Sequence, residues 1–563
     1  MPNLTREQFV HLAGRESSPQ AGPDTGPGSG PGSGPGAGAG GSETLAIPIG
    51  VRLLADQLTP VLAYRRLVAP DERTAPSFLL ESVENGDRLG RHSILGSRPV
   101  VEVVARGHGV EITDRRGSET RVSRSEEADP ADALRQITRG IRLVPPIESV
   151  DRGLLPSCIW GGWFGYASYD TVRYAEPDKL SVGSAPPDDR NLPDLHFGLY
   201  DGVIAFDHVE RLVHVVQLAF VGPDDDAGGV YDRAVEKLRS RVEEIQTHSK
   251  PLPAGTVAPA HAKTAPMPSN ISRGEHSEMV SRAKEYIAAG DIFQVVLGQR
   301  FERTSAADPF DVYRALRAVN PSPYMVYMQA GPCILVASSP EILCRVERAD
   351  NAGFMVTNRP LAGTRKRGKT PAEDLALERE LLADEKERAE HIMLVDLGRN
   401  DVGVVAKPGT IELSEVMSIE RYSHVMHISS TVTGLLRDGL DCWDALRAAL
   451  PVGTISGAPK IRAMQIIDEL EPVRRGPYGG GMGAIGLDGQ MDIALALRTM
   501  VVPVAMHDEQ AGVWTYHIQA SGGIVADSNA DDEFMETVNK AAALGRAVDL
   551  AEQAFGSGPA ANA

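Results

Sequence analysis

Short apolar runs separated by turn residues dominate the chain between residues 45 and 248. Examples are VVEVVARG (100–107), GVEITD (109–114), GVIAFD (202–207) and RLVHVVQLAF (211–220). Alternating or continuous apolar runs of this length are typical of β-strands, and the turn residues between them favour antiparallel neighbours. This part of the chain is therefore predicted to form a largely antiparallel sheet with a few helices.

Beyond residue 270, helical and strand patterns are mixed. Apolar residues recur at helical spacing in three long stretches, and we expect one helix in each: 275–290, 371–397 and 533–555. Three other runs are strand-like: 291–301, 333–339 and 514–525. The fold class that fits is α+β, with helices packed on antiparallel sheets.

Two segments have no apolar period. Residues 18–44 are dominated by PGPGSGPGSGPGAGAGG, which cannot bury apolar area. We therefore expect residues 1–44 to be a disordered leader and the ordered chain to start near Ile47. Residues 249–270, rich in proline and alanine, are predicted to be a linker or a long surface crossing.

Length and composition bound the class of protein. A chain of 563 residues has room for one large body or two closely packed units, which we divide into regions 45–248 and 271–555 and a disordered tail, 556–563. The net charge of −19 argues against a nucleic-acid partner. No apolar stretch is long enough to span a bilayer, so we expect no membrane association and a cytoplasmic location. The cysteines have neither metal nor redox spacing, which suits a reducing compartment: Cys158, Cys333, Cys344 and Cys442.

A Glu-x-x-Glu spacing occurs twice in predicted helices, at Glu387 and Glu390 and again at Glu533 and Glu536. Three residues apart is one helix face, where like charges cost about 0.2–0.5 kcal/mol per pair. A hard divalent cation between two such helices would offset that cost and would imply an anionic substrate. Alone, each pair is more simply explained as a solvated face. Lys540, four residues after Glu536, suits a substrate carboxylate or a plain helix ion pair.

Several polar groups in predicted strand ends and loops could converge on one anion. RPLAGTRKRG (359–368) offers backbone N–H groups, and ASGGIV (520–525) is read as a second small-residue loop, or an ordinary turn. Arg498 stands in an apolar run, where a carboxylate ligand and a structural salt bridge are both reasonable partners. GMGAIG (481–486), preceded by Tyr478, matches a dinucleotide motif only weakly and is interpreted as a tight glycine-rich loop.

Two further residues have open interpretations. His427 alternates along a predicted strand, where a lone histidine is more often a core residue than a catalyst. Glu341 directly follows a predicted strand and is either a buried acid with a raised pKa or a cap. The sequence contains no P-loop, no H-E-x-x-H and no G-x-S-x-G, which weakens nucleotide transfer, zinc hydrolysis and serine hydrolysis as functions.

A series of long motifs resembles the chorismate-utilising enzymes. In chain order they are DIFQVVLGQRF, NPSPYM, SSPE, RPLAGT, ERAEHIMLVDLGRND, ERYSHVMH, GTISGAPK, GPYGGGMG, GIVADS and ETVNKA. Residues 275–545 resemble the family at large, and nearly the whole ordered chain resembles its anthranilate synthase component I members. The resemblance implies two antiparallel β-sheets packed as a sandwich with helices on the outside, and an active site in a cleft toward one end.

The resemblance also implies roles for individual residues. Mg²⁺ would be held directly by Glu390 and Glu536, with Glu387 and Glu533 as outer support. Glu341 is similar to the general acid that protonates the departing C4 hydroxyl of chorismate as ammonia attacks C2, and His427 to the histidine implicated in the later loss of pyruvate. The substrate carboxylates would be bound by Gly363, Thr364, Tyr478, Arg498, Ser521, Gly522 and Gly523, with Lys540 in support.

Two positions separate members of the family. Water-using relatives have a lysine base where this chain has Gln294, and aminodeoxychorismate synthases have a lysine where this chain has Ala362. Both residues imply amination to anthranilate, the first committed step of tryptophan biosynthesis. The family often has Gly-Ala-Gly where this chain has Ser521 to Gly523, so the serine could crowd the substrate carboxylate or hydrogen-bond it.

A second site and a partner are also implied. SFLLESVENG (77–86) is similar to the family's tryptophan-binding segment and implies feedback inhibition by tryptophan. The residues concerned are Leu80, Glu81, Ser82, Pro323, Tyr324 and Met325. No glutaminase domain is attached, so ammonia from glutamine would require a glutamine amidotransferase subunit. The alternatives are an aminodeoxychorismate- or aminodeoxyisochorismate-type synthase, and a non-catalytic sensor of chorismate or tryptophan.

Overall fold

The computed structural model describes residues 2–16, 43–82, 90–145, 154–247, 251–257, 265, 267–349, 353–422 and 425–556. Two 12-stranded, mostly antiparallel sheets organise this part of the chain. The first sheet runs in the order β20 (Gly457–Ala458), β12 (Gln294–Ser305), β24 (Trp514–Ile524), β23 (Thr499–Pro503), β14 (Cys333–Ser339), β13 (Tyr324–Gln329), β2 (Ser77–Glu81), β3 (His92–Ser97), β10 (Gly202–Asp207), β11 (Leu212–Val221), β1 (Thr44–Leu54) and β7 (Ile141–Leu143). β7 pairs with β1 in parallel.

The second sheet, like the first, combines strands from regions 45–248 and 271–555. It runs in the order β17 (Leu361–Lys366), β19 (Val425–Leu435), β16 (Gly353–Asn358), β15 (Ile342–Ala349), β22 (Met491–Leu495), β21 (Gly481–Gly486), β8 (Gly162–Ala167), β9 (Leu195–Tyr200), β4 (Val101–Arg106), β5 (Gly109–Asp114) and β6 (Arg121–Glu126), with β18 (Glu412–Arg421) paired to β19. The predicted strands at 100–107, 109–114, 202–207 and 211–220 are confirmed as β4, β5, β10 and β11.

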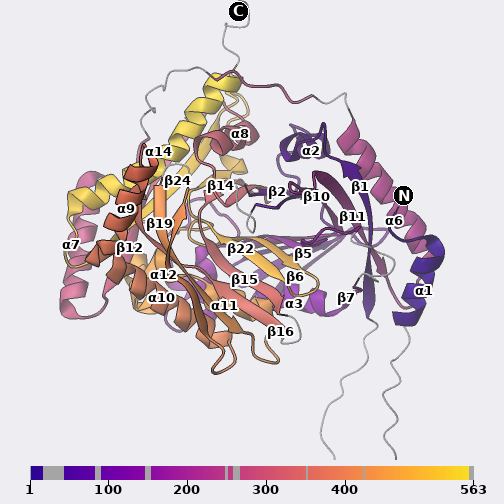
Figure 1. Cartoon of the computed structure of the whole chain (residues 1–563), viewed down its shortest axis with the longest axis horizontal. Helices are drawn as coiled ribbons and strands as arrows, with labels where there is room; N and C mark the ends of the chain where they lie inside the picture. The colour runs from indigo at the N-terminus through magenta and orange to yellow at the C-terminus, as the bar shows by residue number, and fades with distance from the viewer. Residues whose placement is uncertain are drawn as a thin grey trace, which may run out of the picture.

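The two sheets pack face to face, as the α+β sandwich expectation required. Phe78 of β2 stacks on Phe164 of β8 at 3.9 Å between ring centroids, within an apolar layer that also contains Met328, Leu335 and Met482. Helices α6 (Ala227–Gln246), α8 (Pro309–Val319) and α14 (Ala530–Phe555) pack on the first sheet, and α10 (Glu385–Val405) and α11 (Cys442–Ala449) on the second (Figure 1). The remaining helices are α1 (Arg6–Glu16), α2 (Pro60–Leu67), α3 (Ala131–Arg139), α5 (Val172–Ala175), α7 (Arg273–Ala289), α9 (Pro371–Ala383), α12 (Gly453–Ser456) and α13 (Lys460–Leu470).

Regions 45–248 and 271–555 form one body, because each sheet takes about half its strands from each region. The junctions are β2 with β13 in the first sheet and β8 with β21 in the second. In Figure 1 the indigo-to-magenta strands of the first region continue into the orange-to-yellow strands of the second. A site at either junction therefore draws residues from both regions.

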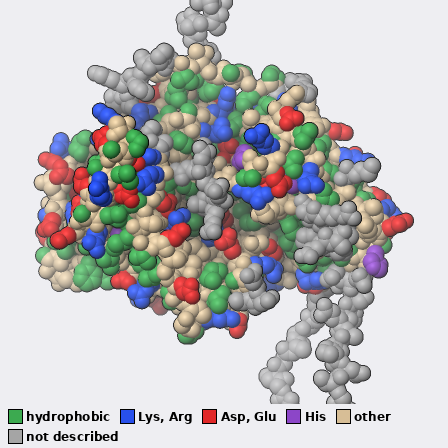
Figure 2. All heavy atoms as spheres, viewed as in Figure 1, with side chains coloured by type: hydrophobic (Ala, Val, Ile, Leu, Met, Phe, Trp, Pro, Cys, Tyr) green, Lys and Arg blue, Asp and Glu red, His purple; other side chains and the backbone are tan. Residues whose placement is uncertain are grey.

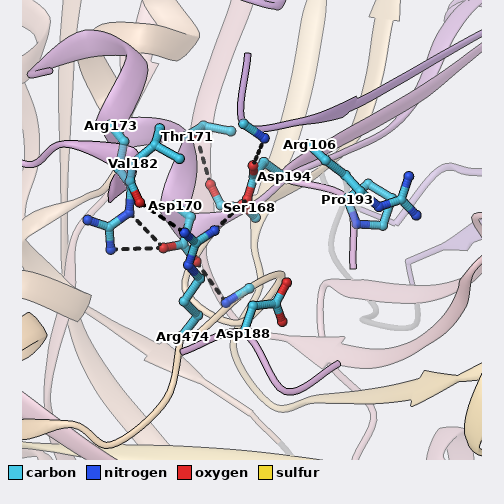
Figure 3. Close-up of polar contacts among 12 residues, drawn as sticks. Arg106, Ser168, Asp170, Thr171, Arg173, Val182, Asp188, Pro193, Asp194 and Arg474 are labelled. Atoms are coloured by element: carbon cyan, nitrogen blue, oxygen red, sulfur yellow. Dashed lines mark hydrogen bonds and ion pairs between the residues drawn. The ribbon is translucent and has the colours of Figure 1, made fainter. Parts of the chain in front are cut away.

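Buried charges reinforce the junction (Figure 3). Asp170 pairs with Arg173 at 3.0 Å and accepts a hydrogen bond from the Gly476 N–H at 3.1 Å. Arg173 also donates two hydrogen bonds to Asp468 of α13, at 2.8 and 2.9 Å. Because both Asp170 and Arg173 are 2% exposed, leaving either unpaired would be costly. The network fixes the first region against the turn that follows α13.

The expectation of a disordered leader is wrong for residues 6–16, which form α1. The apolar face of this helix is buried, with the Phe9 ring 5.3 Å from that of Tyr231 on α6. Residues 6–16 do not share the glycine-rich composition of residues 18–44, on which the expectation of disorder was based. Residues 17–42 of the leader and 557–563 of the tail lie outside the described residues.

Three local expectations are also wrong. Residues 371–397 form two helices, because Asp384 caps α10 by accepting hydrogen bonds from the N–H groups of Lys386 and Glu387. GMGAIG and ASGGIV are strands, β21 and the end of β24, and not loops; for ASGGIV the strand-like run predicted at 514–525 is the expectation that is confirmed. A Cβ at Gly483 would lie 2.3 Å from the Asp492 carbonyl oxygen, so glycine lets neighbouring strands approach there.

The surface in Figure 2 carries acidic and basic side chains side by side, and this face has no continuous basic area. A chain as acidic as this one is a poor partner for a polyanion. Within the described residues, none of the helices has the length and apolar character needed to cross a membrane.

Candidate active site

A cavity of about 530 Å³ opens between the ends of both sheets and helices α10 and α14. Nearly all the residues expected at the substrate and metal site line it, namely Gln294, Glu341, Ala362, Gly363, Thr364, Glu387, Glu390, His427, Tyr478, Arg498, Ser521, Gly523, Glu533, Glu536 and Lys540. Gly522 lies just behind this lining, where a side chain would contact Glu533. Groups separated by more than 200 residues along the chain thus face one space.

Both Glu-x-x-Glu pairs lie within the first two turns of their helices and face the cavity. Asn529 caps α14 as Asp384 caps α10. The pKa of Glu390 is raised by burial and then by the charges of Glu387 and Glu536. The carboxylates of the two helices therefore repel one another across the cavity, and a bound cation would relieve that repulsion.

The present partners of these carboxylates are weak or incomplete. Glu387 pairs with Arg365 at 3.1 Å, and Glu536 with Lys540 at 2.6 Å on the exposed rim. Glu533 accepts a hydrogen bond from Ser528 at 2.6 Å, but its other oxygen, Oε2, is buried without a partner among the described residues. The exposed Glu536–Lys540 pair is worth about 0–1 kcal/mol, so an ion could displace it.

The donor set fits a hard divalent cation. Among the residues that the structure describes, no three His, Cys, Asp or Glu side chains are already drawn together as a metal-binding group. However, the cavity offers carboxylates from two helices, one of them with an unpartnered buried oxygen. Mg²⁺ takes one or two carboxylates and keeps several waters, so it does not need a preformed cage.

Arg498 provides the positive charge opposite the carboxylates. It follows β22 at φ 46, so the backbone leaves the strand there and sends the guanidinium toward the cavity. Burial lowers its pKa, and no described carboxylate forms an ion pair with it. A deeply placed cation without a counter-ion is a binding site for an anion. The salt-bridge interpretation of Arg498 is thereby excluded for the described residues.

Tyr478 and Ser521 form the neighbouring wall. The Tyr478 hydroxyl donates to Ser521 Oγ at 3.1 Å, and burial raises the Tyr478 pKa to about 12. Ser521 therefore accepts a hydrogen bond within the wall, while its effect on the substrate carboxylate, by crowding or by hydrogen bonding, stays a prediction. Lys540 Nζ donates to the Ser521 carbonyl at 2.9 Å in addition to its pair with Glu536. The helix ion pair, one of the two readings of Lys540, is thus present.

Glu341 is a buried acid. It lies between β14 and β15, and burial raises the pKa of its carboxyl group to about 8, while a hydrogen bond from Thr454 opposes the shift. The Thr454 hydroxyl donates to Glu341 Oε1 at 3.0 Å. At neutral pH the carboxyl group is therefore mostly protonated and able to give a proton.

His427 is a buried, neutral imidazole in the cavity wall. Burial, followed by the charge of Arg498, lowers its pKa to about 4. Its Nδ1 lies 3.1 Å from the carbonyl oxygen of Gly363, which can only accept. Nδ1 therefore carries the proton and Nε2 the lone pair. Gly363 adopts φ 72 at a bulge between Ala362 and Thr364, which turns this carbonyl toward the histidine.

The two specificity positions also face the cavity. Gln294 donates a hydrogen bond to Glu390 and lies against Gly523, whose missing side chain leaves room for the amide. Ala362 is buried on β17. Thr454 was missed from the sequence, although it stands in the quoted motif GTISGAPK. Its closeness to Glu341 depends on a fold contact over more than 100 residues, for which a single sequence has no signal.

A second cavity of about 490 Å³ lies where β2 meets β13, at a junction of the two regions. It is lined by all the residues expected to bind tryptophan: Leu80, Glu81, Ser82, Pro323, Tyr324 and Met325. Glu81 is occupied by Tyr313 at 2.6 Å and Arg317 at 2.8 Å, whereas Ser82 Oγ is buried without a partner among the described residues. Residues 83–86 of the expected segment lie outside the described residues.

Comparison with known proteins agrees with the geometry. Residues 77–546 match the family model described as chorismate binding enzyme. The chain is 52% identical over 524 residues to anthranilate synthase alpha subunit 1, chloroplastic, of Oryza sativa subsp. indica, covering 90% of this chain and 89% of that protein. It is 44% identical over 512 residues to anthranilate synthase component 1 of Streptomyces coelicolor, covering 90% of each.

The fold comparison points the same way. The crystal structure of anthranilate synthase component I from Streptococcus pneumoniae TIGR4 superposes with a TM-score of 0.66 and 33% identity, covering 88% of this chain and 99% of that one. The matches extend through both sheets and both cavities. This chain therefore belongs to the chorismate binding enzymes, in the group of the anthranilate synthase component 1 and alpha subunits.

Proposed function

We propose that this chain is the chorismate-binding subunit of an anthranilate synthase. It would aminate chorismate with ammonia and then eliminate pyruvate to give anthranilate, the first committed step of tryptophan biosynthesis. The observation that carries the proposal is the Arg498 guanidinium, which lines the same cavity as the protonated acid Glu341 and has no described counter-ion. That combination suits a substrate with carboxylates and a poor leaving group.

The cavity wall would hold the substrate by its carboxylates. Arg498 and Tyr478 supply charged and neutral donors, and the backbone of Gly363 and Thr364 supplies N–H groups. Glu390 and Glu536 would hold Mg²⁺ directly, with Glu387 and Glu533 outside them. When bound, the ion supplies positive charge that orients the ring carboxylate and offsets the four acids.

The protein's own proton donors and acceptors account for both steps. In the first step ammonia attacks C2, the C4–O bond breaks, and Glu341 gives its proton to the departing hydroxyl, which leaves as water. In the second step His427 Nε2 takes the C2 proton, the C3–O bond breaks, and the enolpyruvyl group leaves as pyruvate with an added proton. The neutral state of His427 supports this role, because an imidazolium could not accept.

The residues beside the cavity favour ammonia as the nucleophile. Gln294 has an amide that does not remove a proton from water, and Ala362 offers no lysine for a covalent intermediate. The nearest rival is an aminodeoxychorismate- or aminodeoxyisochorismate-type synthase, which would stop before aromatisation. The position of His427 in the cavity wall favours completion of the reaction.

The proposal also includes a partner subunit and an inhibitor. Ammonia from glutamine would come from a separate glutamine amidotransferase subunit, as the name component 1 of the relatives suggests. Tryptophan would bind the second cavity, where the unpartnered Ser82 hydroxyl is available to a polar ligand. Binding there would favour one conformational state and lower activity at the first cavity.

The test is product analysis with the purified chain, chorismate, MgCl₂ and ammonium chloride. We expect the fluorescence and mass of anthranilate, lost on addition of EDTA and restored by excess Mg²⁺. An amino product that is not aromatic would establish the rival synthase. Chorismate binding without turnover would establish the sensor.

A further inference from the structure

A buried ion pair lies directly behind the wall of the active-site cavity. Glu471 follows α13, and Arg475 stands in the turn that leads to Tyr478. Their side chains are 3% and 1% exposed, with Arg475 Nη2 and Glu471 Oε1 2.6 Å apart. Burying two charges costs free energy that their attraction often fails to recover, so stability alone does not explain the pair.

Arg475 binds the backbone of two residues that line the cavity. Its Nη1 donates to the Ile455 carbonyl at 2.6 Å, and its Nη2 donates to the Val296 carbonyl at 2.7 Å. Ile455 directly follows Thr454, the residue that donates to Glu341. The guanidinium therefore ties β12 to the short helix α12 that supports the general acid.

Glu471 binds the same wall from the other side. Its Oε1 accepts a hydrogen bond from the Gly298 N–H at 2.8 Å. Gly298 lies opposite Ser521 in the β12–β24 pairing, and Ser521 accepts the hydrogen bond of Tyr478. Glu471 Oε2 accepts a hydrogen bond from Arg475 Nε at 2.9 Å, so both oxygens of the Glu471 carboxylate have hydrogen-bond partners.

Residues of the first region, 45–248, also contact the turn that carries Arg475. The Arg475 guanidinium lies 4.7 Å from the centroid of the Tyr169 ring. The Tyr169 N–H donates to the Gly476 carbonyl at 2.9 Å, and Asp170 accepts from the Gly476 N–H at 3.1 Å. The turn that carries Arg475 and leads to Tyr478 is thus held on both sides.

We infer that Glu471 and Arg475 are positioning residues for the substrate wall. They set the spacing between the Tyr478–Ser521 side of the cavity and the Thr454–Glu341 side without touching the substrate. The identity of that substrate rests on the proposed function. The carboxylates on α10 and α14 are not among the described partners of the pair, so its loss should change substrate binding and leave metal binding intact.

The test uses Arg475→Lys and Glu471→Gln in the full chain. Lysine keeps the charge but is a single point donor, so it cannot serve two carbonyls and a carboxylate at once. Because displacements of about 1 Å can cost about 100-fold, we expect the KM for chorismate to rise at least about tenfold in Arg475→Lys. Glu471→Gln keeps an acceptor for Gly298 and should give a smaller rise. The Mg²⁺ concentration for half-maximal activity should stay within about twofold, since the metal carboxylates are untouched.

Asp201→Asn is the matched control. Asp201 is 4% exposed and pairs with Arg241 at 2.6 Å, away from both cavities. It should lower the melting temperature without changing KM, because a partly unfolded sample loses active enzyme but not affinity. A lowered melting temperature with unchanged KM in both pair variants would overturn the inference. If Arg475→Lys is insoluble, the single-atom change Glu471→Gln decides.

Failure of the proposed function would be visible separately. If the wild-type chain makes no product, the proposed function is contradicted. Chorismate affinity measured by calorimetry then reports directly on substrate binding by the cavity wall. Weaker binding in the pair variants, with the wild-type affinity in Asp201→Asn, would still support positioning. Equal affinity in all of them would contradict it.

Discussion

The active-site cavity and the second cavity differ in how their charges are balanced. In the active-site cavity Arg498 has no described counter-ion, Glu533 has an unpartnered buried oxygen, and the charges of the carboxylates raise the pKa of Glu390. In the second cavity Glu81 is satisfied by Tyr313 and Arg317. The first cavity thus contains charged groups without a described partner, whereas Glu81 of the second cavity is already paired.

The difference separates chemistry from recognition. Uncompensated groups are held in place by the surrounding fold and become stabilised only when a complementary anion and cation arrive. A cavity with paired charges, such as Arg345 with Asp492 at 3.0 Å, can bind a ligand through shape and a few hydrogen bonds. The lining of the first cavity comes from region 271–555 alone, whereas the second cavity takes residues from both regions, so the two cavities also differ in which parts of the chain build them.

The largest effect should come from Glu341→Gln. The amide cannot give a proton, and general acid catalysis is worth about 10²–10⁴-fold, so we expect kcat for chorismate with ammonium to fall by that factor. Chorismate affinity by calorimetry should be unchanged. A kcat within threefold of wild type would remove Glu341 from the acid role.

The next largest effect should come from the glutamates assigned to Mg²⁺, and the loss of Mg²⁺ binding should differ between direct and outer ligands. Glu390→Gln and Glu536→Gln should weaken Mg²⁺ binding by about 100-fold or more, since each removes charge and a hard ligand. Glu387→Gln is the control, expected to cost about 10-fold as an outer group. Titration of activity with Mg²⁺ measures both, and equal effects in all three variants would refute the division into direct and outer ligands.

The raised pKa of Glu341 predicts a pH dependence. Because only the protonated acid is active, kcat should fall with rising pH above about 8. The folded pKa lies above the unfolded value of about 4.5, so the stability associated with the protonated group is complete below that value and lost as pH rises toward 8. Glu341→Gln should therefore raise the melting temperature more at pH 8 than at pH 5. A larger gain at pH 5 would contradict the burial of an ionisable group.

The smallest effect on catalysis should come from the second cavity. Ser82→Phe fills space beside Leu80 and Tyr324 and should relieve tryptophan inhibition, while kcat and KM stay within about twofold, the range of changes away from a catalytic site. Inhibition curves with and without tryptophan measure it. Inhibition that persists unchanged would place the tryptophan site elsewhere.

The sequence predicted which residues gather in the first cavity better than it predicted their local structure. Glu390 and Glu536 were singled out because spacing and motif coincide on helices, and Glu341 because it follows an evident strand; their chemical roles stay predictions. By contrast, β21 was mistaken for a loop, since its glycines are explained only by the close neighbours β8 and β22. Strand pairing over hundreds of residues is not written in a single sequence.

Two other features could not be predicted from the sequence, because they also depend on tertiary contacts. Helix α1 depends on burial of Phe9 against α6, a tertiary contact that outweighs the composition of the segment that follows. The Glu471–Arg475 pair is an ordinary charge pair by spacing, and only the fold makes it a link between Val296 and Gly298 behind the substrate wall.

The most direct test of the charge contrast is chorismate affinity after Arg498→Met, measured by calorimetry with Mg²⁺ present. Removal of one partner from a desolvated charge pair costs about 2–5 kcal/mol, so the dissociation constant should rise roughly 30-fold or more. Arg498→Lys should recover part of this loss, because it restores the charge without the planar fork. Wild-type affinity in Arg498→Met would contradict the account, since the cation without a counter-ion would then not be the substrate's partner.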